Sequence, residues 1–264
     1  MATPYSIRIS SQKGGVGKTT FAVNFSVALR ELGYKVILID SDFVNPAVST
    51  YLGLDPHDIW LVDSIHGRKS VNESVVHTAN GIDVVPGKLS VNVPRLSNRD
   101  LDAWLEKLKR TDYDFIVTDT QPGIAYADVL KFYNEALIIV TPDNPSCINA
   151  IRMVNRYDKA HLKNSVVVNM ARHRPYELSK DDIEDAVSTR VLGVIPEDEL
   201  VPLSIYEQRA AVELKRNGRF SSAVRRIANH YAVTVGGRGR GIGIQAGDGR
   251  GGKINALMRI LHLR

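Results

Sequence analysis

The chain has little cysteine and no long apolar segment. Cys147 is the one cysteine among 264 residues. A single thiol excludes an internal disulfide framework and a four-cysteine metal site within one chain, and it fits a reducing cytosol. No stretch of about 18 apolar residues occurs, so we expect no membrane-spanning helix. The N-terminal run MATPYSIRIS lacks a charged region followed by an apolar one, and we therefore expect no secretory signal.

Positive charge is concentrated at one end of the chain. The net charge is +5, but the residues from Ile205 onward contain 12 Lys or Arg and 3 Asp or Glu. Residues 1–204 contain 22 basic and 26 acidic residues, so they are net negative. We expect a phosphate-rich partner, either a membrane surface or nucleic acid, to bind the C-terminal part.

The segment Ile7–Thr20, IRISSQKGGVGKTT, is the strongest chemical signal. It predicts a strand, a glycine turn and a helix, in which backbone N–H groups and a helix N-terminus meet phosphate oxygens. Lys18 is expected to reach the β- and γ-phosphates, and the Thr19 hydroxyl to bind Mg²⁺ directly. The residues predicted to surround the phosphates are Gly14, Gly15, Val16, Gly17, Lys18, Thr19 and Thr20.

The string KGGVGKT within this segment resembles the deviant Walker A motif of the MinD/ParA family of ATPases, with MinD-type members most similar. Gln12 stands where the general phosphate-loop pattern has its first glycine. The resemblance implies ATP and Mg²⁺ as cofactors. It also implies a homodimer formed on ATP binding, in which Lys13 reaches the nucleotide of the partner subunit.

Apolar strand-like runs alternate with helical patterns along residues 1–235. This alternation predicts an α/β domain of three layers, with a mostly parallel twisted sheet covered by helices on both faces, as in P-loop NTPases. The expected strands are 7–9, 35–40, 81–86, 114–119, 136–142, 165–169 and 191–196. The expected helices are 18–32, 47–54, a short one within 55–80, 100–110, 146–160, 179–187 and 220–232.

Acidic residues end two of these strands, and ligands of parallel sheets lie at the carboxyl ends of strands. The resemblance gives each acid a role. Asp42 is the candidate catalytic acid, whereas Asp40 and Asp119 would hold Mg²⁺ through water. Asn45 matches the first switch of the family and Gly123 the second, where Gly123 would sense the γ-phosphate. Proline stands at 122 here, one position later than in the family pattern.

The family places an asparagine at the end of a later strand, where it contacts adenine, and Asn169 matches it. Met170 follows, where family members usually have arginine. The last strand is followed by Pro196, Glu197 and Asp198, which in relatives form a wall of the base pocket. We therefore predict that these four residues bind the adenine end of the nucleotide.

The C-terminal residues differ in composition from the rest. Residues 236–252 contain nine glycines, which predicts a flexible linker. Residues 253–264 have an amphipathic helical pattern too short to be stable alone in water. It resembles the membrane-targeting sequence of MinD-type proteins, and docking on the chain's own domain or on a partner protein are the alternatives. The residues predicted to meet an anionic membrane are Lys253, Ile254, Leu257, Met258, Arg259 and Leu261.

The combined prediction is a slow Mg-ATP-dependent ATPase of MinD type, cytoplasmic and peripheral on the membrane. It would position a division site or surface apparatus with a protein activator or cargo. One rival is a ParA-like ATPase that binds DNA non-specifically. A nucleotide-locked, non-catalytic scaffold is another. The cations available for DNA are Arg209, Lys215, Arg216, Arg219, Arg225 and Arg226. Reductases and cluster carriers of the superfamily need a second cysteine, which this chain lacks.

Overall fold

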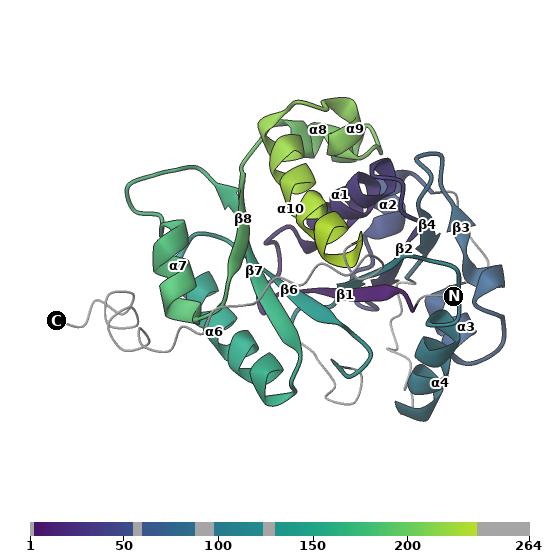
Figure 1. The fold of residues 1–264 in the computed structure, drawn as a ribbon. Helices are drawn as coiled ribbons and strands as arrows, with labels where there is room; N and C mark the ends of the chain where they lie inside the picture. The colour runs from purple at the N-terminus through teal and green to yellow at the C-terminus, as the bar shows by residue number, and fades with distance from the viewer. Residues whose placement is uncertain (1–2, 55–59, 88–97, 124–129, 237–264) are drawn as a thin grey trace.

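A mostly parallel sheet forms the middle of the molecule (Figure 1). The computed structural model describes residues 3–54, 60–87, 98–123 and 130–236. Within them eight strands pair in the order β3-β4-β2-β5-β1-β6-β7-β8, and only β3 and β4 pair antiparallel. The strands are β1 (Tyr5–Ser10), β2 (Val36–Ser41), β3 (Val76–His77), β4 (Asp83–Val85), β5 (Phe115–Thr120), β6 (Glu135–Val140), β7 (Lys163–Ala171) and β8 (Val191–Pro196).

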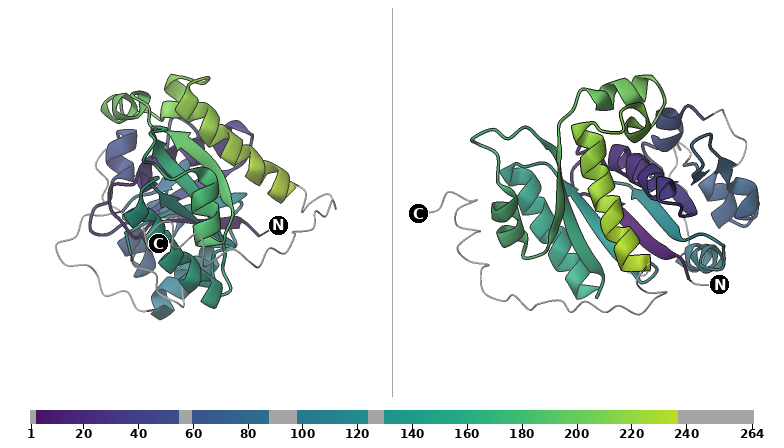
Figure 2. Two further views of the ribbon diagram at one scale, coloured as in Figure 1. Left: turned by 90° about the vertical axis from the view of Figure 1, so that its left-hand side faces the viewer. Right: turned by 45° about the horizontal axis from the view of Figure 1, so that its top comes forward.

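Helices cover both faces of this sheet. The helices are α1 (Lys18–Glu31), α2 (Val48–Leu52), α3 (Leu61–Ile65), α4 (Asn98–Leu108), α6 (Asn144–Lys159), α7 (Lys180–Val187), α8 (Leu200–Tyr206), α9 (Ala211–Leu214) and α10 (Arg219–Gly236), with a 3₁₀ turn at Asn72–Ser74. Figure 2 shows α10 and α1 side by side on one face, while α4, α6 and α7 lie on the other.

Strands buried on both faces explain the two apolar cores. Successive side chains of a strand point to opposite faces. On β5, Val117 belongs to the core under α1 and α10, whereas Ile116 belongs to the core under α4 and α6. Leu137 and Ile138 of β6 divide in the same way. The near-continuous apolar runs of the sequence are therefore explained by a parallel sheet covered by helices on both sides.

The predicted fold class is confirmed, and three elements were not expected. The short helices α8 and α9 and the edge strand β3 gave no clear periodic signal. The helix α4 begins at Asn98 rather than Asp100, and α10 continues to Gly236. The linker from 237 and the amphipathic segment 253–264 lie outside the described residues. Within the described residues, no helix is long and apolar enough to cross a membrane.

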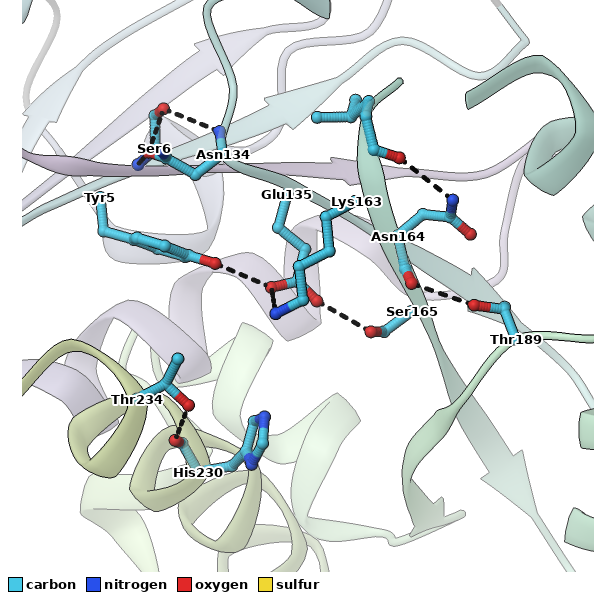
Figure 3. Close-up of polar contacts among 11 residues, drawn as sticks. Tyr5, Ser6, Asn134, Glu135, Lys163, Asn164, Ser165, Thr189, His230 and Thr234 are labelled. Atoms are coloured by element: carbon cyan, nitrogen blue, oxygen red, sulfur yellow. Dashed lines mark hydrogen bonds and ion pairs between the residues drawn. The ribbon is translucent and has the colours of Figure 1, made fainter. Parts of the chain in front are cut away.

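A buried carboxylate lies beside the last turns of α10, at the amino end of β6 (Figure 3). Glu135 is fully buried and accepts hydrogen bonds from Tyr5 Oη (3.0 Å), Lys163 Nζ (2.8 Å) and Ser165 Oγ (2.8 Å). Three donors on one carboxylate offset the cost of burying its charge. The cluster fixes β1, β6 and β7 to one another on the side opposite the phosphate loop.

Replacing this carboxylate is expected to destabilise the fold. A Glu135→Gln amide accepts through one atom only, so one donor loses its acceptor and Lys163 loses its counter-charge. Since Lys163 is half exposed and can turn to solvent, we expect a loss of about 2 kcal/mol of unfolding free energy. Urea unfolding measures it. The control Glu73→Gln, on an exposed glutamate, should leave the unfolding free energy close to that of wild type. Equal losses would contradict this account.

Candidate functional site

The phosphate loop connects β1 to α1 at the carboxyl edge of the sheet. Gly17 precedes α1 and has φ 86°, a left-handed conformation that glycine adopts without strain. Gly15 also has positive φ, 76°. The loop therefore depends on glycine at two positions. Lys18 and Thr19 follow in the first turn of α1, as the sequence predicts.

Asn169, at the end of β7, supports this loop from behind. It is buried, and its Nδ2 donates a hydrogen bond to the carbonyl oxygen of Val16 at 2.9 Å. A Cβ atom on Gly17 would overlap the same Nδ2 atom. The structure thus gives Asn169 a positioning role that sequence reasoning missed. Its contact with adenine stays a prediction.

Three acidic residues, Asp40, Asp42 and Asp119, lie near one another beside the phosphate loop. Asp40 and Asp119 are directly paired in the register of β2 and β5, and both are buried. Thr19 Oγ1 donates to Asp119 Oδ2 at 2.5 Å. Oδ1 of Asp119 is buried and has no hydrogen-bond partner among the described residues. Hydroxyl and carboxylate oxygens are what Mg²⁺ prefers, and an unsatisfied buried oxygen fits a nearby cation.

Burial dominates the electrostatics of these groups. Burial, and then the neighbouring Asp119, raises the pKa of Asp40 to about 8. Burial raises the pKa of Asp119 to about 6, although its hydrogen bond from Thr19 and the charge of Lys18 oppose the rise. Burial lowers the pKa of Lys18, whereas Asp119 and Asp42 favour its charged form. The charged forms of the two buried carboxyl groups are therefore disfavoured in the nucleotide-free site, and a nearby divalent cation would favour them.

The raised pKa values predict a pH dependence of the stability of the nucleotide-free protein. A carboxyl whose pKa rises from 3.8 on folding stabilises the fold below that value and loses this contribution as pH passes its folded pKa. We expect Asp119→Asn to raise the unfolding free energy at pH 8 by at least about 1 kcal/mol, and the gain to vanish towards pH 4. Thermal unfolding at several pH values measures this. A gain independent of pH would contradict it.

Asp40 and Asp42 also stabilise the conformation of the loop that follows β2. Asp40 Oδ1 accepts from the amide of Asp42 at 3.2 Å, and Asp40 Oδ2 accepts from the amide of Val48 at 3.1 Å. Asp42 Oδ1 accepts from the amides of Val44 (3.1 Å) and Asn45 (2.9 Å). No described residue hydrogen-bonds Oδ2 of Asp42. This oxygen is therefore available to a ligand.

The phosphate loop and the loop 42–47 line one open cavity of about 430 Å³. Its lining residues are Gly14, Gly15, Gly17, Lys18, Thr19, Thr20, Asp42, Val44, Asn45, Ala47, Gln121 and Pro122. The predicted phosphate, catalytic and first-switch residues are thus together, with Lys13 exposed at the edge of the loop. The amide of Gly123 donates to the carbonyl oxygen of Ser11 at 2.9 Å. Its contact with a γ-phosphate would require this bond to break, and it stays a prediction.

The predicted base-side residues lie at the carboxyl ends of β7 and β8: Asn169 is within β7, Pro196 is the last residue of β8, and Glu197 and Asp198 follow it. Arg172 donates two hydrogen bonds to Glu197, at 2.5 and 2.6 Å, and so joins the two strand ends. Asp198 accepts from the amides of Leu200 and Phe220. The ion pair between Arg172 and Glu197 was not predicted from the sequence.

Of the six cations predicted to be available for DNA, one is engaged in an ion pair inside the domain. Arg225 donates two hydrogen bonds to Glu31, both at 2.8 Å, and further ones to backbone carbonyls. The remaining cations of the set are exposed, and no ion pair engages them within the described residues: Arg209, Lys215, Arg216, Arg219 and Arg226.

Comparisons with known proteins agree with this geometry. The family model described as CobQ/CobB/MinD/ParA nucleotide binding domain matches residues 7–211. The chain is 27% identical over 253 residues to the septum site-determining protein MinD of Thermotoga maritima, covering 90% of each chain. It is 31% identical over 240 residues to the antiactivator FleN of Pseudomonas aeruginosa, covering 84% of each.

A solved structure extends the likeness to the fold. The septum site-determining protein MinD from Pyrococcus horikoshii, complexed with Mg-ADP, superposes with a TM-score of 0.82 at 26% identity, over 90% of this chain and 100% of that one. The phosphate loop, the strand-end acids and the sheet order are thus explained together. The chain belongs to the CobQ/CobB/MinD/ParA family of nucleotide-binding domains.

Proposed function

We propose that the protein is a Mg-ATP-dependent ATPase of MinD type that dimerises on ATP binding and associates reversibly with a membrane surface. One observation carries the enzymatic part. Lys18, Thr19 and Asp42 line the same cavity, and Asp119 accepts a hydrogen bond from Thr19. Phosphoryl transfer to water requires a cation that binds phosphate, a hydroxyl that binds the metal and carboxylates beside them.

Each residue then has a chemical task. Lys18 and the amides of the phosphate loop hold the β- and γ-phosphates. Thr19, Asp40 and Asp119 would hold Mg²⁺, which supplies charge neutralisation at the phosphates. Asp42 orients the attacking water through Oδ2 and accepts its proton. The Mg-ADP bound to the Pyrococcus relative supports this pair of cofactors.

Lys13 is proposed to complete the site from the partner subunit. Its position at the loop edge, exposed and with no side-chain hydrogen bond or ion pair among the described residues, suits a contact across a dimer. A cation from the partner would stabilise the charge of the transferring phosphoryl group. In this scheme ATP drives dimerisation because each bound nucleotide is shared between two chains.

The membrane part of the proposal rests on sequence alone. Residues 253–264 are amphipathic and basic, and the glycine-rich segment before them follows α10. One short helix binds a bilayer marginally, so two of them on a dimer bind far better through effective concentration. ATP hydrolysis would then release the protein from the membrane. The names of the relatives, a septum site-determining protein and an antiactivator, support a positioning or regulatory role with a protein partner.

A DNA-partitioning role is the second candidate, and the five exposed cations between Arg209 and Arg226 favour it. Such a surface would contact phosphates without reading sequence. The negative charge of residues 1–204 confines this contact to the α8–α10 side. A nucleotide-locked scaffold remains the alternative without turnover.

Light scattering after size exclusion tests the dimer. Wild-type protein with a non-hydrolysable ATP analogue and Mg²⁺ should elute as a dimer, and with ADP as a monomer. The Lys13→Ala variant should bind the analogue but remain monomeric. Arg226→Ala is the matched control for loss of an exposed cation and should behave as wild type. A Lys13→Ala variant that dimerises normally would refute the shared site.

A further inference from the structure

A buried polar cluster links α1 and α2, which follow the phosphate loop and the loop 42–47, to α8. Its members are Asn24 of α1, Tyr51 of α2 and Ser204 of α8, all nearly inaccessible to solvent. Tyr51 Oη lies 2.9 Å from Asn24 Nδ2 and 2.7 Å from Ser204 Oγ. Buried polar groups are kept only when their hydrogen bonds are made, and these groups share them across three helices.

The donors and acceptors in this cluster have only one consistent arrangement. Ser204 Oγ donates to the carbonyl oxygen of Val201 at 2.7 Å, so its proton is not available to Tyr51. Tyr51 must therefore donate to Ser204 and accept from Asn24. On the other side, Asn24 Oδ1 accepts from the amide of Val212 in α9 at 3.0 Å. Within the described residues the tyrosine hydroxyl thus hydrogen-bonds side chains of both α1 and α8, in addition to the apolar packing of α2 against these helices.

Both ends of α2 are tied to the nucleotide site. The first residue of α2, Val48, donates its amide to Asp40 Oδ2, and the loop 42–47 that holds Asp42 precedes it directly. Asn24 Nδ2 also donates to the carbonyl oxygen of Thr20, in the first turn of α1. One turn of α2 therefore separates the loop that carries Asp42 from the hydroxyl of Tyr51.

We propose that Tyr51 is a positioning residue: it holds the loop 42–47 in the arrangement that recognises ATP, and it couples the position of this loop to the position of α8. This inference rests on the proposed function. The phosphate loop itself is supported by Asn169 and by its own glycines. Removing the Tyr51 hydroxyl therefore removes a restraint on the helix that follows the loop 42–47 and leaves the hydrogen bond that supports the phosphate loop in place.

The consequence is a selective loss of ATP recognition. ADP lacks the γ-phosphate, so we expect its affinity not to change. We expect recognition of the γ-phosphate and of the attacking water to depend on Asp42 and Asn45. Without the Tyr51 hydroxyl, ATP binding must also supply the free energy that orders the loop 42–47. One net hydrogen bond corresponds to about a tenfold change in an equilibrium constant.

The Tyr51→Phe variant tests this directly, because phenylalanine keeps the ring that packs in the core. We expect about tenfold weaker binding of a non-hydrolysable ATP analogue with Mg²⁺, and ADP affinity within about twofold of wild type. Turnover at saturating ATP should also fall. Tyr34→Phe is the matched control, since it removes one tyrosine hydrogen bond, to the carbonyl oxygen of Ala232, at the far end of α1.

Hydrogen exchange of α8 gives a second readout. In wild-type protein the analogue should change the protection of residues 200–206, whereas Tyr51→Phe should abolish this response. The Ser204→Ala variant removes the link between Tyr51 and α8, together with a hydrogen bond to Val201 inside α8, so it should lose the response and keep the ratio of ATP-analogue to ADP affinity. Parallel losses of analogue and ADP affinity, or no change in either, would overturn the proposal. A wild-type protein that binds the analogue but never hydrolyses ATP would refute the enzymatic proposal while leaving this test intact.

Discussion

The Gly17→Ala variant is expected to bind ADP about 100-fold more weakly than wild type. At φ 86° an alanine is strained in any environment. Here its Cβ would also overlap Nδ2 of Asn169, so this side chain must move and its hydrogen bond to Val16 breaks. The loop amides then no longer converge on the phosphates. Isothermal titration with Mg-ADP measures the effect.

Gly14→Ala is the control in the same loop. A Cβ at position 14 meets nothing within 4 Å, and the residue has no positive φ. We expect its ADP affinity to stay within about threefold of wild type, because neither strain nor overlap arises. Equal losses at both positions would show that the loop needs glycine for another reason, and that the support from Asn169 is not important.

The Asp42→Asn variant is expected to lower turnover at least about 100-fold while keeping ATP binding. An amide oxygen can still accept from the amides of Val44 and Asn45, so the loop keeps its fold. What is lost is the carboxylate that is proposed to orient the attacking water and accept its proton. Single-turnover hydrolysis, compared with the dissociation constant of the ATP analogue, separates the two effects.

Two outcomes would contradict this role of Asp42. Turnover within a few-fold of wild type would exclude it as the general base, and parallel losses of turnover and ATP affinity would make it a binding residue. A protein with no turnover in either form would favour the scaffold alternative. The matched control is Asp63→Asn, at a carboxylate on α3 that pairs with Arg68 and should leave turnover unchanged.

Much of the fold and of the phosphate site follows from local sequence. The spacing of Gly14, Gly15 and Gly17 before Lys18 defines a loop whose neighbours are a strand and a helix, so geometry and chemistry are encoded together. Asp40 and Asp119 end apolar strands, and pairing of those strands in parallel is enough to bring the two carboxylates together.

The support around the site depends on contacts between distant residues and could not be predicted in this way. Asn169 reaches Val16 across 153 positions of sequence, and Tyr51 reaches Ser204 across the same number. The helices α8 and α9 are too short to show a period, and Tyr51 reads as an ordinary apolar position of α2. Their roles become visible only when the partners of each buried polar atom are identified.

Sedimentation with anionic liposomes is the most direct test of the proposed switch. The account predicts that wild-type protein pellets with liposomes in Mg-ATP, stays in solution in Mg-ADP, and fails to pellet in either when truncated after Gly236. Duplex DNA should not shift under the same conditions. A protein that ignores liposomes but binds DNA in an ATP-dependent way would contradict the membrane switch and assign the exposed cations between Arg209 and Arg226 to partitioning.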